Sequence, residues 1–185
     1  MTALDWIFTA IALLWVCEFI LFRNRGTGEE DAVEKRSFLL IFGALSGTIA
    51  VAAILGEMRS FEPVNSWLKA TGVLFFAGGV VLRYWGILHL KSQFTRHVTV
   101  RQGDGIVSTG PYRKLRHPLY TGLLLIAIGM ALFFQSLVAA IFGGVLVGWA
   151  LAKRMDGEEA LLLAEFGEEY REWMEKRARL IPFLY

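Results

Sequence analysis

The chain has 185 residues, 55% of them hydrophobic, and a formal net charge of +2. Soluble domains seldom exceed about half apolar residues, so this composition indicates a membrane-embedded protein. The net charge is too small to indicate a nucleic-acid partner. Cys17 is the only cysteine, which excludes an internal disulfide and provides no zinc-binding spacing, so no metal site is expected.

Five apolar segments follow one another along the chain, at residues 4–22, 37–55, 67–90, 118–134 and 137–152. The first lacks a basic region and a small-residue cleavage site, which favours a membrane anchor over a cleaved signal. The last two are close to the lower limit of about 17 residues for a membrane span, so they predict a tight hairpin that does not reach full depth. The expected fold is therefore an all-α integral membrane protein with about five transmembrane helices.

We expect one membrane-embedded domain over residues 1–185. It comprises three helices (4–90), a loop that carries a polar motif (91–122), a helical hairpin (118–152) and an amphipathic tail (153–185). The loops after the first and third segments, together with the tail, hold 16 of the 19 Lys and Arg residues. By the positive-inside rule the N-terminus is outside, and the motif and tail are cytosolic. The compact chain is expected in a prokaryotic inner (plasma) membrane.

The motif spans residues 110–122 and crowds cations at the start of an apolar helix. Pro118 suits the first helical position, because its missing N–H costs nothing there. His117 and Arg116 then lie beside free N–H groups and the positive end of the helix dipole, where a carboxylate would bind. Gly122 lets a flat ligand approach the backbone. An ordinary helix start with a positive-inside anchor explains the pattern equally well.

The tail carries a second group of charges. Arg154 and Glu158 lie four residues apart on one helical face, and Glu159 follows. A carboxylate pair is a good receptor for an ammonium or sulfonium cation, although a solvated helix with one weak ion pair is the simpler explanation. The Phe166–Gly167 pair is expected to interrupt the helix.

Two charged residues fall inside apolar segments. Glu18 is expected to reach the cytosolic interface or to pair with Arg23. Arg83 either points into a cavity lined by the cytosolic motifs or extends to the interface.

The run Gly110-Pro111-Tyr112-x3-Arg116-His117-Pro118-x-Tyr120-x-Gly122 resembles the signature of the isoprenylcysteine carboxyl methyltransferase family, which is related to phospholipid N-methyltransferases. The tail is similar as well, in Arg154, the Glu158-Glu159 pair, Phe166-Gly167, Tyr170 and Ile181-Pro182. The resemblance covers more than half of the chain, from about Arg83 onward.

This resemblance implies a membrane enzyme that uses S-adenosylmethionine without a Rossmann domain. It implies that His117, Tyr120 and Gly122 line the cofactor pocket and that the Glu158-Glu159 pair binds the amino end of the cofactor. Tyr112 and Arg116 of the same motif are also expected to bind the cofactor. Arg154 and Arg83 are the candidates for orienting the acceptor.

The acceptor is expected to be a lipophilic small molecule or lipid that enters from the bilayer, and its reacting group is left open between carboxylate, phenol and amine. Family members that methylate prenylated cysteine carry a histidine shortly before the Gly-Pro-Tyr turn, where this chain has residues 104–109 without one. A membrane reductase with a nicotinamide cofactor and a non-catalytic membrane subunit are the alternative functions.

Overall fold

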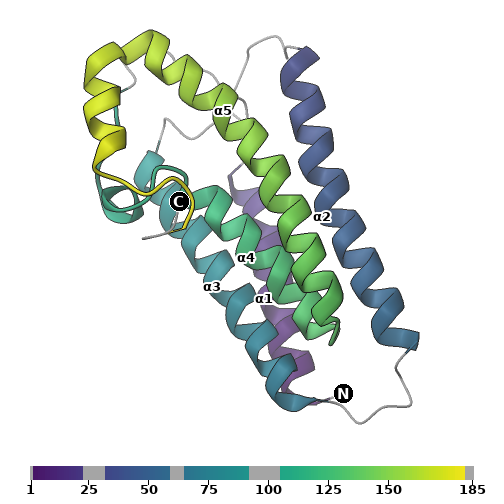
Figure 1. Cartoon of the computed structure of the whole chain (residues 1–185). Coiled ribbons are helices and arrows are strands. Elements are labelled where there is room, and N and C mark those ends of the chain that lie inside the picture. Colours follow the sequence, from purple (N-terminus) through teal and green to yellow (C-terminus); the bar gives the residue numbers. More distant parts are fainter. Residues whose placement is uncertain (1, 23–31, 59–64, 92–104, 182–185) are drawn as a thin grey trace.

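The computed structural model describes residues 2–22, 32–58, 65–91 and 105–181. Five helices pack side by side, and a short 3-10 helix precedes the fourth (Figure 1). Within these residues there is no named β-strand, which confirms the all-α architecture. The bounds are α1 (Ala3–Leu21), α2 (Ala32–Met58), α3 (Ser66–Leu90), η2 (Gly110–Arg113), α4 (Pro118–Phe133) and α5 (Leu137–Glu175).

Within the described residues, four helices are long and apolar enough to cross a membrane: α1, α2, α3 and α5. The fourth predicted segment corresponds to the short helix α4, which has 16 residues. It packs closely on α3. A Cβ atom added to Gly72 would lie 2.4 Å from the backbone nitrogen of Phe133, and one added to Gly129 would lie 2.5 Å from the backbone nitrogen of Phe76. Helix α4 is thus largely enclosed by protein. How deep the α4–α5 hairpin reaches into a bilayer stays a prediction.

The turn between α4 and α5 closes one end of the bundle. Gln135 has a φ of 60°, and its side-chain oxygen accepts a hydrogen bond from the backbone N–H of Asn65 at 2.7 Å. Ser136 then caps α5 by accepting from the backbone N–H of Ala139 at 3.2 Å. The N-terminus lies at this same end (Figure 1).

Glu18 has an ionic partner on another helix that the sequence did not suggest. Its side chain is 2% exposed and forms an ion pair with Arg83, whose Nε donates to Glu18 Oε2 at 2.8 Å. The suggested partner, Arg23, lies outside the described residues. A buried carboxylate requires an opposite charge close by, and α3 packs beside α1 and brings the guanidinium of Arg83 to it.

Helix α5 is longer than the predicted segment and has two parts. The apolar part corresponds to residues 137–152, and the helix then continues as a polar, charged extension. Gly167, with φ 55° and ψ −125°, breaks the helix where the Phe166–Gly167 pair predicted an interruption. A positive φ suits glycine because it has no Cβ atom. After the break the chain turns back toward the bundle (Figure 1).

The segment after this break, residues 168–181, is called the C-terminal arm below. Its backbone pairs with the residues before α4: Arg116 N–H donates to the Ala178 carbonyl at 2.8 Å, and Ala178 N–H donates to the Lys114 carbonyl at 3.0 Å. The hydroxyl of Thr121 donates to the Leu180 carbonyl at 2.6 Å. The arm is thereby fastened across the start of α4.

Candidate active site

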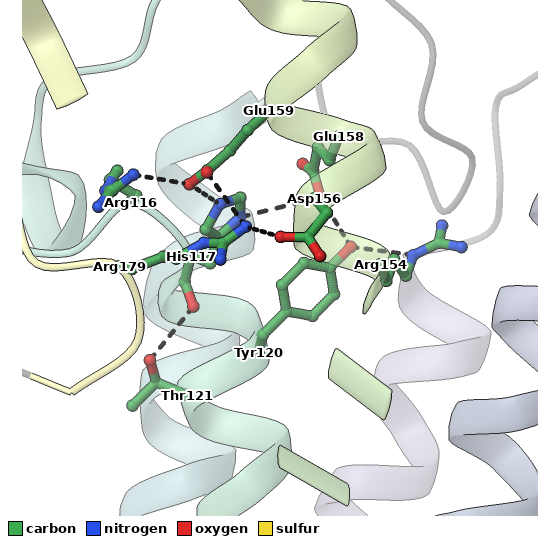
Figure 2. A network of polar contacts seen from close by, with 9 residues as sticks. All are labelled: Arg116, His117, Tyr120, Thr121, Arg154, Asp156, Glu158, Glu159 and Arg179. Carbon is green, nitrogen blue, oxygen red and sulfur yellow. Dashed lines mark hydrogen bonds and ion pairs between the residues drawn. The ribbon is translucent and has the colours of Figure 1, made fainter. Parts of the chain in front are cut away.

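A network of charged and polar side chains gathers where α4 begins and α5 becomes polar (Figure 2). Both groups of residues singled out in the sequence lie in it, although about 40 positions separate them. Its members are Arg116, His117, Tyr120, Thr121, Arg154, Asp156, Glu158, Glu159 and Arg179. The network lies at the end of the bundle away from the α4–α5 turn.

Glu159 is the centre of one half of this network. Its carboxylate accepts from Arg116 Nη1 at 2.9 Å, pairs with His117 Nε2 at 3.0 Å and lies 3.2 Å from Arg179 Nη2. Burial by itself would raise the pKa of this carboxyl, but hydrogen bonding to His117 and the charges of His117, Arg116 and Arg179 outweigh it and lower the pKa. Glu159 therefore joins α5, the start of α4 and the C-terminal arm.

Tyr120 is the centre of the other half. Its hydroxyl donates to Glu158 Oε2 at 2.8 Å and accepts from Arg154 Nε at 2.9 Å. The predicted shared face of Arg154 and Glu158 is confirmed, and a tyrosine from another helix bridges the two. Glu158 also lies 3.8 Å from His117 Nδ1. Its side chain is 28% exposed, against 12% for Glu159, so Glu158 is the more accessible carboxylate.

Tyr112 is a buried residue just before the start of α4. It is 6% exposed, and a Cβ atom added to Gly86 of α3 would lie 3.5 Å from its hydroxyl. Burial raises the pKa of this hydroxyl well above its ordinary value, and the charge of Glu158 adds to the effect. The Tyr112 carbonyl accepts from Arg177 Nε at 2.8 Å, which is a further attachment of the arm. The predicted contact of Tyr112 with the cofactor stays a prediction.

Gly122 and Arg83 lie against each other below the network. A Cβ atom at Gly122 would lie 2.6 Å from Arg83 Cγ and 2.8 Å from the Gly79 carbonyl oxygen. The missing side chain thus lets α3 and α4 approach closely. Arg83 Nη1 donates to the Leu119 carbonyl at 3.2 Å in addition to its pairing with Glu18. That Gly122 contacts the cofactor and that Arg83 orients the acceptor both stay predictions.

Several residues of the network were not found from the sequence. Asp156 pairs with Arg179 Nη2 at 2.6 Å, and Ser37 of α2 accepts from Arg154 Nη1 at 2.8 Å. The spacing of Asp156 and Glu159 by three positions was a usable signal, because residues i and i+3 share a helix face. Nothing in the sequence of α2 pointed to Ser37.

An apolar groove of about 550 Å³ adjoins the network. It runs along α4 and α5 from the far end of the bundle to the C-terminal arm. Met155, the neighbour of Arg154, lines its polar end, as does Leu180, whose carbonyl accepts from Thr121. The groove is lined chiefly by aliphatic side chains and glycines, including Leu124, Ile128, Leu132, Ile141, Gly144 and Val145. The groove therefore reaches the same turn of α5 as the network, although Arg154 itself is not among its lining residues.

Known proteins with similar sequences are methyltransferases. The model of the isoprenylcysteine carboxyl methyltransferase (ICMT) family matches residues 71–164. Protein-S-isoprenylcysteine O-methyltransferase A of Arabidopsis thaliana is 30% identical over 145 residues, which cover 76% of this chain and 74% of the relative. A probable protein-S-isoprenylcysteine O-methyltransferase of Oryza sativa subsp. indica is 23% identical over 187 residues, covering 97% and 96%.

The human protein-S-isoprenylcysteine O-methyltransferase is 29% identical over 121 residues, covering 64% of this chain and 43% of the human protein. The family match includes the start of α4 and the carboxylate pair of α5, the two places where the sequence resemblance was found. The chain belongs to the isoprenylcysteine carboxyl methyltransferase family and is an integral membrane methyltransferase.

Proposed function

We propose that this enzyme transfers a methyl group from S-adenosylmethionine to the carboxylate of a lipophilic, S-prenylcysteine-like acceptor, at the cytosolic end of the bundle. The observation that carries the proposal is the position of Arg154, which contacts the polar network through Tyr120 while its neighbour Met155 lines the apolar groove. The names of the relatives support the prenylcysteine acceptor. Because the family is one of methyltransferases, it does not favour the alternative functions of a nicotinamide-dependent reductase or a non-catalytic membrane subunit.

The residues present fit the charged end of this donor. The network of Figure 2 contains three arginines and three carboxylates around His117, and such a balanced set suits a group that carries both an ammonium and a carboxylate. Glu158 is the more accessible acidic side chain and would hold the ammonium. Arg116 and His117 at the start of α4 would hold the carboxylate.

When bound, S-adenosylmethionine supplies an electrophilic methyl group on a sulfonium. An acceptor carboxylate is already anionic, so no side chain has to remove a proton from it. The work of the protein is to align the two groups and to exclude water. Arg154 would hold the acceptor carboxylate, the groove would hold its apolar chain, and the C-terminal arm, with Trp173 anchored to Ser108 at 2.9 Å, would cover the donor.

The purified protein in detergent or nanodiscs should bind S-adenosylmethionine in calorimetry and should form a base-labile methyl ester on N-acetyl-S-farnesylcysteine. Base lability identifies an ester and separates it from an N- or S-methyl product. A folded sample that binds the donor but labels only amines of a lipid extract would replace the carboxylate acceptor. No donor binding by a folded sample would contradict the proposal.

Activity should rise with the length of the prenyl chain, because each additional isoprene unit buries more surface in the apolar groove. The measurement is kcat/KM for a series of N-acetyl-S-alkylcysteines, with donor affinity measured in parallel and expected to stay constant. Replacing Gly144 in the groove by Leu should shorten the optimal chain, whereas the same change at Gly157, around which no atom lies within 4 Å of an added Cβ, should not. Equal activity on short, water-soluble acceptors would contradict entry from the bilayer.

A further inference from the structure

Helix α2 carries no motif of the family, yet it contributes one side chain to the network. Ser37 lies near the N-terminal end of α2, at the same end of the bundle as the network. Its hydroxyl accepts a hydrogen bond from Arg154 Nη1 at 2.8 Å, although 117 positions separate the two residues. Resting on the proposed function, we infer that Ser37 is a positioning residue, which orients the guanidinium of Arg154 toward the acceptor carboxylate.

The packing of α2 on α5 sets this contact. A Cβ atom added to Gly143 of α5 would lie 2.1 Å from Thr48 Cγ2, so these two residues touch. Ser37 precedes Thr48 by 11 positions and Arg154 follows Gly143 by 11. In two antiparallel helices, 11 residues correspond to about three turns, which returns the chain to the same face. The Thr48–Gly143 contact therefore fixes the register that brings Ser37 to Arg154.

The side chains that face the partner helix between these two contacts include a buried apolar cluster. Ile41, Ala44 and Leu45 of α2 pack in one cluster with Val147, Ala150 and Leu151 of α5. Close-packed side chains of this kind leave little room for the helices to slide. Ser37 is thus held at the polar end of a rigid interface, and its hydroxyl has a fixed place relative to α5.

Two of the hydrogen bonds that Arg154 makes go to side chains of different helices. Nε donates to Tyr120 at 2.9 Å and Nη1 donates to Ser37, so α4 and α2 hold two different nitrogens of one planar group. A guanidinium held in this way presents a fixed direction to a carboxylate, whereas one hydrogen bond would leave it free to rotate. The arginine is 7% exposed, which makes each of these contacts count more than at a surface.

The test compares Ser37→Ala, Ser37→Thr and the control Ser46→Ala, which alters an exposed serine on the same helix. Ser37→Ala should lower kcat/KM for the prenylcysteine acceptor about tenfold, the size expected for one hydrogen bond to a charged group. Donor affinity and melting temperature should match those of Ser46→Ala. Ser37→Thr keeps the hydroxyl and should restore most of the activity.

A purely structural role for Ser37 would be recognised by product inhibition. The methyl ester product has no negative charge, so the loss of Ser37 should leave its inhibition constant unchanged while weakening the carboxylate acceptor. Equal weakening of acid and ester, or a Ser37→Ala enzyme as active as the wild type, would overturn the inference. Failure of the wild type to methylate any carboxylate would instead overturn the proposed function.

Discussion

Replacing Glu159 by Gln is expected to lower the free energy of unfolding by about 3 kcal/mol, since it leaves Arg116, Arg179 and His117 around a neutral amide. Because the same residue joins α5 to the C-terminal arm, donor binding should be lost with it. Chemical denaturation and calorimetry in detergent measure the two effects. The pKa of Glu159 is lower in the folded chain, so its stabilising effect is present above the ordinary carboxyl value of 4.5 and fades as the pH falls below it.

Two variants make this prediction specific. Glu165→Gln, at an exposed position of the same helix, should behave as the wild type. Glu158→Gln should weaken donor binding by about 1.5–3 kcal/mol, the range for a hydrogen bond to a charged group, with a smaller loss of stability than Glu159→Gln. Donor affinity and stability of wild-type size in Glu159→Gln would show that the ion pairs contribute little.

Replacing Arg154 by Met is expected to reduce kcat/KM for the acceptor by at least a hundredfold, about 3 kcal/mol. Met has a similar length and is apolar, so it avoids leaving a buried charge without partners, and Tyr120 keeps its hydrogen bond to Glu158. Donor affinity should change by no more than a few-fold, which calorimetry checks. The comparison separates loss of acceptor orientation from loss of the donor site.

The control for Arg154 is Arg171→Met, because the Arg171 side chain is 61% exposed and forms only a surface pair with Glu168. Arg154→Lys should also be much less active, since an ammonium cannot reproduce the planar contacts to both Tyr120 and Ser37. Near-normal transfer by Arg154→Met would assign the acceptor to another cation, and Arg83 would then be tested in the same way.

Much of the site was determined by the sequence alone. Pro118 begins α4 and Gly167 breaks α5 as predicted, because the geometry of proline and glycine is a local property of the chain. The shared face of Arg154 and Glu158 follows from the helical repeat. The apolar segments are equally local, since a run of about 17 or more mostly apolar residues identifies a candidate membrane span from the sequence alone.

Only the tertiary structure decided which charges pair. The pairing of Glu18 with Arg83 could not be read from the sequence, because two helices must lie side by side before a carboxylate on one can reach a guanidinium on the other. The same holds for Arg179 with Glu159 and for Ser37 with Arg154, which depend on the fold of the arm and the register of α2 on α5. The residues that share one face of a helix follow from their spacing in the sequence, whereas contacts between helices depend on how the helices pack against one another.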